Sequence, residues 1–387
     1  MSVFGIVCET NPIHNGHKHL IATAKAKGAD AVVCVMSGNT VQRGEFAIAD
    51  KYLRAEALLR CGADIVLELP FPWSSSSAEY FARAAVYILQ KFCDTIIFGS
   101  ECGDIRLLEK AARYANSSEF KKEYAVRLSD GEGAAHAYFD MLCQKAEIAF
   151  SSNDLLGVEY IKAARSLSAN IKFQTVKRLG DSYTSTEVKD VTYPSAMSIR
   201  KMWQENNIEN LEEYMPSEAI AIYLNAIKEG GITDKEKLDT VLLTFFRTHC
   251  GSDFNNVVGA SGGLANRICE MSHKARSADE LLALVKTKRY TDSSIKRTML
   301  YCLAGVEKKH IEALPDETLL LSANKNGRSL LSRSRRADGV RVYTKPADLN
   351  VDLAQNQLAN RIDAIYCILR KDIMTSDSYI RKGPFII

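Results

Sequence analysis

Two histidines near the N-terminus, His14 and His17, have a spacing that suits work on a phosphate chain. They follow a short apolar run, Val3–Cys8, and stand at the start of a helical stretch near 16–27. A helix start offers unpaired N–H groups and a positive dipole end, which suit phosphate, and Gly16 lets the backbone approach a ligand closely. Two imidazoles can donate to the oxygens of one phosphate and stabilise the charge that builds on a pentavalent phosphorus. The pattern therefore predicts nucleotide chemistry at an α-phosphate.

Other interpretations of this turn are weaker. Two surface histidines would do no chemistry, but H-x-G-H directly after the first strand of a βα unit is a rare match by chance. A zinc site would need a third and a fourth ligand, and none is in view. The ten cysteines contain no C-x-x-C pair, so we expect no metal site and interpret the cysteines as small buried side chains.

The elements that must position this turn alternate along the first 100 residues. Continuous apolar runs at 3–8, 31–36, 65–69 and 95–98 are separated by helical patterns at 16–27, 50–61 and 78–90. This alternation predicts a parallel sheet with helices on its faces, and continuous apolar runs are typical of strands covered on both sides. The predicted fold class is α/β: a doubly wound, Rossmann-like parallel-sheet domain followed by a mainly helical C-terminal region.

The pattern along the whole chain predicts three parts. The first, 1–206, is a catalytic domain with a helical insertion at about 103–145, strands at 147–150 and 173–176, and a helix from Asn153 to about Leu167. The second, 207–310, is helical, with helices at 217–228, 234–248, 278–287 and 293–303. The third, 311–387, is a small α/β region with strands at 319–322 and 340–343 and a helix at 350–369.

The amino-acid composition says more about the cellular location of the protein than about its function. The 387 residues carry a net charge of +3, which neither requires nor excludes a polyanionic partner. The N-terminus has no basic segment followed by a long apolar one, and no run of about 18 apolar residues occurs. With free thiols, this favours a cytoplasmic protein that does not enter membranes.

Longer stretches carry a resemblance to a known family. The N-terminal pattern G-I-V-x-E-x-N-P-x-H-N-G-H resembles the nucleotidyltransferase superfamily with the HIGH-type motif. Further stretches are similar to the bacterial tRNA(Met) cytidine acetate ligase family, closely over 3–205 and more weakly through 287–291. These stretches are Ser37–Gly38–Asn39, Val41 to Glu45, Gly62 to Pro70, Phe98–Gly99–Ser100–Glu101, and Asn153 with Leu156 to Tyr160.

The resemblance implies a two-step reaction. ATP and acetate form acetyl-adenylate and pyrophosphate, and the acetyl group then passes to the wobble cytidine of elongator tRNA(Met), giving N4-acetylcytidine. Mg²⁺ could accompany the ATP phosphates without a dedicated carboxylate site. By position, the implied ATP contacts are Val7, Cys8, Glu9, Thr10, Asn11, Pro12, Ile13, Asn15, Gly16, Lys18, His19, Leu20, Gly99, Ser100, Asn153 and Arg178.

These contacts have physical rationales. Gly99 ends the fourth strand, where ligands sit in open α/β sheets. Asn153 could bond a base or ribose, or simply cap a helix. Arg178 could meet phosphate or the adenine edge, or be a solvated charge.

A second helix start resembles the superfamily's other phosphate motif. There Ser195 and Ser198 would bind the β- and γ-phosphates, and Arg200 would assist the leaving pyrophosphate. Met197 stands where the family usually has threonine, and a thioether donates no hydrogen bond. Thr10, Ile13 and Thr40 likewise replace aromatic residues of the family.

The substrate and tRNA contacts are expected elsewhere. Gln42, Arg43 and Glu45 follow the second strand and could hold the acyl substrate or the cytidine, although an ordinary polar loop has the same composition. Clustered basic residues around Tyr290 predict tRNA contact through Lys288, Arg289, Lys296 and Arg297, and a second arginine cluster spans 328–341. Solvated helix faces are the alternative for both clusters.

Two rival functions remain open from the sequence. A nucleotidyltransferase that adenylylates a small phosphorylated metabolite would share the ATP site but would not need the C-terminal half. A non-catalytic protein that binds RNA or nucleotide could have kept the fold.

Overall fold

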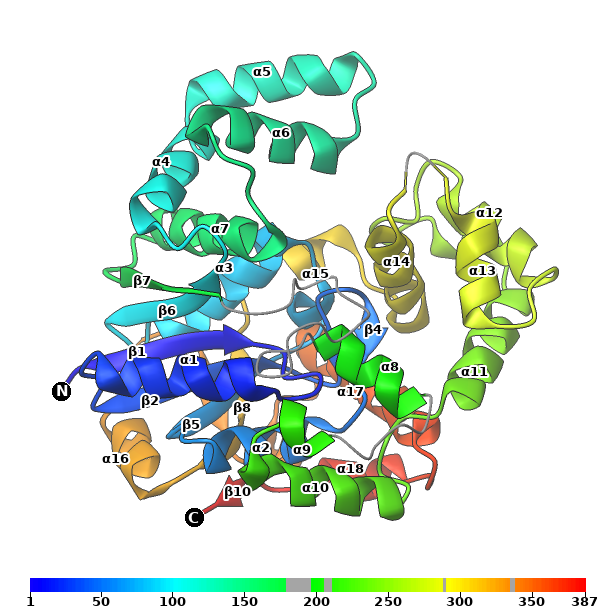
Figure 1. Ribbon diagram of the computed structural model, residues 1–387. Coiled ribbons are helices and arrows are strands. Elements are labelled where there is room, and N and C mark those ends of the chain that lie inside the picture. Colours follow the sequence, from blue (N-terminus) through cyan, green and yellow to red (C-terminus); the bar gives the residue numbers. More distant parts are fainter. Residues whose placement is uncertain (179–195, 205–210, 288–289, 335–337) are drawn as a thin grey trace.

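A mixed sheet, mostly parallel, forms the centre of the computed structural model, which describes residues 1–178, 196–204, 211–287, 290–334 and 338–387. The strand order is β10-β8-β5-β2-β1-β6-β7 (Figure 1). In addition, β9 pairs with β8. The strands are β1 Val3–Cys8, β2 Ala31–Ser37, β5 Ile65–Leu69, β6 Thr95–Ser100, β7 Lys172–Lys177, β8 Glu317–Ala323, β9 Arg341–Tyr343 and β10 Phe385–Ile386, and β3 Thr40–Val41 pairs with β4 Glu45–Phe46 in a separate hairpin.

The doubly wound part matches the predicted class. Strands β5, β2, β1, β6 and β7 are parallel neighbours, and the order of addition reverses between β1 and β6. Such a reversal opens a crevice at the carboxyl ends of the strands, where ligands bind in open α/β sheets. The predicted His turn follows β1 and therefore lies at this crevice.

Helices cover both faces of the sheet because the side chains of each strand alternate between them. Along β2, Val33 and Val35 join a core with helices α3 (Ala78–Leu89) and α7 (Ser152–Ser166). Cys34 and Met36 join the opposite core with α1 (Asn15–Ala26) and α2 (Lys51–Arg60). Both faces are therefore apolar, as the continuous runs predicted.

The C-terminal residues join the same sheet. Strand β8 pairs antiparallel with β5, and β9 and β10 pair with β8. The segment 311–387, predicted as a small region of its own, thus extends the catalytic sheet, which is mixed rather than wholly parallel. Its helices are α16 Lys325–Ser334, α17 Ala354–Leu369 and α18 Ser376–Ile380.

The helical region divides between two cores. Ile199, Trp203 and Tyr223, from the segment that holds α8 (Ala196–Gln204), α9 (Leu211–Tyr214) and α10 (Ser217–Lys228), pack in the α1–α2 core. The predicted boundary at 206 lies outside the described residues, and the packing continues across it. A third core is formed by five consecutive helices and by α17. The five are α11 Lys235–Arg247, α12 Leu264–Ser272, α13 Ala278–Val285, α14 Asp292–Ala304 and α15 Lys308–Glu312.

The predicted insertion is a set of three helices, α4 Ile105–Ala115, α5 Ser118–Ser129 and α6 Ala134–Ala146 (top of Figure 1). The strand predicted at 147–150 is wrong. Glu147 has a left-handed backbone with φ of 59°, which ends α6, and Phe150 is buried in a coil that leads into α7. Single-turn 3-10 helices are η1 Trp73–Ser75, η2 Gly251–Phe254 and η3 Pro346–Asp348.

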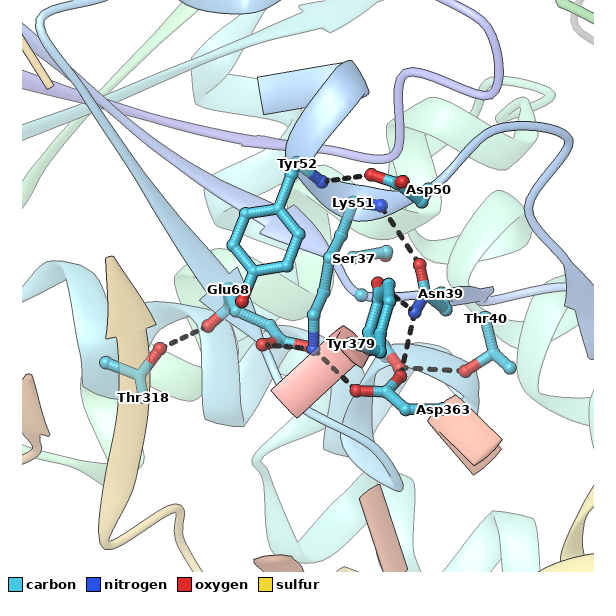
Figure 2. A network of polar contacts seen from close by, with 12 residues as sticks. Ser37, Asn39, Thr40, Asp50, Lys51, Tyr52, Glu68, Thr318, Asp363 and Tyr379 are labelled. Carbon is cyan, nitrogen blue, oxygen red and sulfur yellow. Dashed lines mark hydrogen bonds and ion pairs between the residues drawn. The ribbon is translucent and has the colours of Figure 1, made fainter. Parts of the chain in front are cut away.

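A buried polar network fastens the C-terminal helices to the catalytic domain (Figure 2). The Lys51 ammonium, 2% exposed at its side chain, lies 2.9 Å from Glu68 Oε1 and 2.8 Å from Asp363 Oδ2. Asn39 donates to Asp363 and to the Tyr379 hydroxyl and accepts the backbone N–H of Lys51. The network joins α2, β5, α17 and α18 through charges that would be costly to bury singly.

No helix in the described part of the chain is long and apolar enough to cross a membrane.

Candidate functional site

A cavity that opens to solvent lies at the carboxyl ends of β1, β6 and β7. It brings together the His turn, the hairpin loop, the start of α7 and the start of α8. Its walls are formed by Val7, Cys8, Glu9, Thr10, Asn11, His14, His17, Leu20, Val41, Gln42, Arg43, Glu45, Phe81, Phe98, Gly99, Asn153, Leu156, Tyr160, Arg178, Ala196, Met197 and Arg200.

The two imidazoles cap the first turn of α1. His14 Nδ1 accepts the backbone N–H of Gly16 at 3.1 Å, and His17 Nδ1 accepts the backbone N–H of His14 at 3.2 Å. An accepting Nδ1 carries no proton, so each neutral ring holds its proton on Nε2. The Gly16 N–H expected to meet phosphate is therefore used by the cap, and the Nε2–H groups become the donors of this turn.

Both imidazoles remain neutral near pH 7. Burial, followed by the neighbouring His17 ring and the Arg178 guanidinium, lowers the pKa of His14 well below its ordinary value. Burial and then Arg178 lower the pKa of His17 to about 3. The two rings, with centroids 3.9 Å apart, thus offer neutral hydrogen-bond donors beside a fixed positive charge.

A neutral His17 predicts that stability is lost as the pH falls. In the unfolded chain His17 binds a proton near pH 6.5, whereas in the folded chain its pKa is about 3, so protons favour the unfolded state between these values. Between pH 6.5 and 5 we expect this residue alone to lower the free energy of unfolding by about 2 kcal/mol. The measurement is urea unfolding at both pH values for wild type and for His17→Gln, which keeps an acceptor at the capping position.

The control is His136→Gln, at a side chain that is 76% accessible and whose pair with Glu132 lies at the surface, where an ion pair contributes at most about 1 kcal/mol. It should lose as much stability on acidification as wild type, while His17→Gln loses about 2 kcal/mol less. Equal losses for wild type and His17→Gln would show that His17 is protonated in the folded protein.

Glu101 orients two predicted nucleotide contacts. Its Oε1 lies 3.2 Å from Arg178 Nε and accepts the side-chain amide of Asn153 at 2.7 Å. Ser151, not Asn153, is the N-cap of α7, so the capping role considered for Asn153 is excluded. A Cβ at Gly99 would stand 3.1 Å from Arg178 Cγ, so glycine leaves the space in which the arginine lies.

A second set of charged residues at the cavity links the β3–β4 hairpin to the helical region through ion pairs of Glu45. Glu45 Oε1 lies 2.5 Å from Lys296 Nζ, and Glu45 Oε2 lies 3.7 Å from Arg200. Burial raises the pKa of Glu45, but Lys296 and Arg200 outweigh it, so the net pKa is lowered and the carboxylate stays ionised. Arg200 also donates to the Asn11 carbonyl at 2.6 Å, which links α8 to the His turn.

Lys296 and Arg297, predicted as tRNA contacts, lie against the hairpin rather than on an open helix face. Arg297 donates to the Gln42 carbonyl at 3.3 Å, and burial lowers the pKa of Arg297. Gly44 permits this close approach: its φ is +80°, and a Cβ there would stand 2.4 Å from the Arg297 nitrogen. Helix α14 therefore forms part of the surroundings of the cavity.

Other predicted contacts do not reach the cavity wall. Asn15 donates to the Glu213 carbonyl, Lys18 pairs with Glu218, and the Ser100 hydroxyl donates to Asp154. The remaining predicted residues off the wall are Pro12, Ile13, Gly16, His19, Ser198, Lys296 and Arg297. Ser195, Lys288 and Arg289 lie outside the described residues.

Several wall residues were not predicted as contacts. Phe81, Phe98, Leu156 and Tyr160 are apolar or aromatic side chains, and no catalytic motif in the sequence points to residues of this kind. Leu156 and Tyr160 follow Asn153 by three and seven residues, which places all three on one face of a helix. This helical spacing could have identified Leu156 and Tyr160 as neighbours of Asn153 on the cavity wall. The other missed wall residues are Val41, Ala196 and Met197, the last noted only as a departure from the family.

The three positions where the family shows aromatic residues differ in their surroundings. Thr10 lies on the cavity wall, with its hydroxyl 3.0 Å from the Met36 sulfur. Ile13 and Thr40 are fully buried away from the wall. Of the three, Thr10 is therefore the one that lies on the described wall. Within the described ranges, no group of three or more His, Cys, Asp or Glu residues could hold a metal ion.

Comparisons with known proteins agree with this geometry. The family model described as HIGH Nucleotidyl Transferase matches residues 1–379. A relative from Thermoanaerobacter sp. (strain X514), named tRNA(Met) cytidine acetate ligase, is 33% identical over 394 residues, which cover 98% of this chain and 95% of the relative. A relative of the same name from Caldicellulosiruptor bescii is 36% identical over 355 residues, covering 89% and 87%.

Solved structures extend the likeness. The crystal structure of Thermotoga maritima TmcAL in an apo form has a TM-score of 0.92 at 32% identity and covers 100% of both chains. The crystal structure of the same protein bound with alpha-thio ATP has a TM-score of 0.87 at 30% identity, again over 100% of both chains.

Proposed function

The chain belongs to the tRNA(Met) cytidine acetate ligase family of HIGH nucleotidyl transferases, and from this membership we propose that it activates acetate with ATP and acetylates the wobble cytidine of elongator tRNA(Met). The enzyme is an ATP-dependent ligase whose products are N4-acetylcytidine, AMP and pyrophosphate. A cytoplasmic location is part of the proposal, since its substrate is a tRNA.

One observation carries the first step. The Nε2–H groups of two neutral imidazoles belong to the same cavity as Arg178 and Arg200. Acetate attacks the α-phosphorus directly, so no enzymic nucleophile is required. His14 and His17 donate to the oxygens on which charge builds, and Arg200 stabilises the leaving pyrophosphate. Magnesium would enter with the ATP phosphates.

The second step needs the cytidine amine at the same cavity. The hairpin residues Gln42, Arg43 and Glu45 supply polar groups there, and α14 adjoins them through Lys296. The tRNA would therefore approach from the α13–α14 side. The second arginine cluster is less suitable: α16 lies at the amino ends of the strands, where Asn326 bonds the Asp30 carbonyl just before β2.

This arrangement predicts a difference between the two basic clusters. Lys288→Ala combined with Arg289→Ala should weaken tRNA affinity and reduce its salt slope by about 0.7 to 0.9 for each phosphate that the variant no longer neutralises. Arg328→Ala combined with Arg333→Ala, on exposed positions of α16, is the matched control and should change neither. Filter binding across a salt series measures both quantities. A larger effect in the α16 pair would move the tRNA site to the opposite end of the sheet.

Exchange of labelled pyrophosphate into ATP tests the proposed activation step. Exchange should depend on acetate and should not need tRNA, because acetyl-adenylate forms first. Exchange with a phosphorylated metabolite but not with acetate would favour an adenylylating nucleotidyltransferase instead. Absence of exchange with every acid would favour a binding protein.

A further inference from the structure

Acetyl transfer to an amine releases a proton that must have an acceptor. The cytidine N4 nitrogen forms a bond to the acetyl carbon, the bond between that carbon and the phosphate oxygen breaks, and AMP leaves with the electron pair. One N4 proton is lost in the process. A positioned base that takes this proton typically accelerates such a step by about 100-fold to 10,000-fold.

The two imidazoles are unsuited to this role. Each Nδ1 already accepts a backbone N–H at the start of α1, and each Nε2 carries the proton that serves the first step. Protonation of either ring would place a cation beside Arg178 in a buried site, and the pKa of both rings is accordingly lowered. A positioned base on the wall would therefore have to be a group other than these two rings.

Two carboxylates stand on the described wall of the cavity, Glu9 and Glu45. Glu45 is held by Lys296 at 2.5 Å and faces Arg200 at 3.7 Å, so its negative charge is stabilised and its basicity is low. In active sites with two carboxylates in different environments, one commonly stays ionised and stabilises charge while the other transfers a proton. Glu45 fits the first task, which leaves the second to Glu9.

Glu9 is held firmly at the edge of the sheet. It directly follows β1, and its Oε1 accepts the backbone N–H of Gln42 at 2.6 Å. Its own carbonyl accepts from Arg54 Nη1 at 2.7 Å, and Arg54 is fully buried. Both ends of the residue are thereby fixed between the His turn and the loop that we assign to the cytidine and the acyl group.

We propose that Glu9 is the general base that accepts the N4 proton of cytidine during acetyl transfer, an assignment that rests on the proposed ligase function. Among the described residues, those that face Glu9 include Arg200 from α8 and Arg43 and Glu45 from the hairpin. Burial raises the pKa of Glu9, and it outweighs the Gln42 N–H and the two arginines, so the carboxylate is a better base than an exposed glutamate.

The test uses synthetic acetyl-adenylate and elongator tRNA(Met) in single-turnover reactions, so that the first step is bypassed. Glu9→Gln keeps an oxygen that can accept the Gln42 N–H, and it should lower the transfer rate by about 100-fold to 10,000-fold. The wild-type rate should fall on the acidic side as Glu9 becomes protonated, and this limb should be missing from Glu9→Gln. Glu119→Gln on α5, at a side chain that is 66% exposed, is the control and should match wild type.

The outcomes separate the two proposals. Wild-type transfer rates in Glu9→Gln, with an unchanged pH profile, would overturn the role of Glu9. Failure of the wild-type enzyme to acetylate the tRNA would instead overturn the proposed function. If Glu9→Gln does not fold, Glu9→Asp decides: it should keep the acidic limb at a reduced rate, and a profile without that limb would contradict the assignment.

Discussion

Replacing either His14 or His17 by alanine should lower acetate-dependent pyrophosphate exchange by about 100-fold to 1,000-fold. Each substitution removes one Nε2–H donor from a site where both rings are neutral and their Nδ1 atoms are fixed by backbone N–H groups. A preorganised donor in a partly buried site stabilises developing charge without the reorganisation that water requires. Pyrophosphate exchange reports this step alone, so the loss should appear without tRNA.

The variants also remove helix caps, and this effect must be separated from the chemistry. His14→Asn and His17→Gln keep acceptors at the capping positions, so they should recover stability but not the imidazole-dependent rate. His136→Ala removes a histidine that is 76% exposed and far along the chain in α6, and it should exchange as wild type does. Wild-type exchange in His14→Ala or His17→Ala would contradict the assigned role of that residue.

The second large effect is expected on stability. Lys51→Met should lower the free energy of unfolding by about 3 to 5 kcal/mol, because it leaves the buried Glu68 and the partly buried Asp363 without their shared cation. Burial alone would lower the pKa of Lys51, yet the facing carboxylates of Asp363 and Glu68 outweigh it, and the pKa lies above its ordinary value. The ammonium is therefore charged in the folded protein, and the network in Figure 2 depends on that charge.

Arg60→Met is the matched control on the same helix. Arg60 is 45% exposed at its side chain and pairs with Glu56 at 2.7 Å, a surface contact that contributes at most about 1 kcal/mol. Urea unfolding of both variants measures the difference. Similar small losses in the two would show that the buried carboxylates are protonated or hydrated when Lys51 is removed.

The strands and helices that could be predicted from the sequence are those identified by the local pattern of apolar residues alone. Strands β1, β2, β5 and β6 are covered on both faces, and their unbroken apolar runs identify them without knowledge of their neighbours. Helices α10 and α11 were likewise found from their periodicity. By contrast, the antiparallel placement of β8 beside β5 depends on a pairing between segments about 250 residues apart, and no local pattern encodes such a pairing.

The site residues likewise fall into those that a local motif predicts and those that only the folded chain brings together. His14 and His17 were found because their chemistry and spacing are visible in nine consecutive residues. Glu101, which orients Arg178 and Asn153, has no motif of its own in the sequence beyond the stretch Phe98–Gly99–Ser100–Glu101. Its role arises from the way β6, β7 and α7 meet in space. The pairing of Lys296 with Glu45 also arises from folding, since it joins helix α14 to a hairpin far earlier in the chain.

The most direct measurement of the central claim is acetylation of tRNA by the purified enzyme. Unmodified elongator tRNA(Met) is incubated with ATP and labelled acetate, and the digested nucleosides are analysed by mass spectrometry. We expect N4-acetylcytidine at the wobble position, dependent on both ATP and acetate, and absent when that cytidine is replaced by uridine. Acetate-dependent adenylate formation without any acetylated cytidine in this tRNA would contradict the central claim.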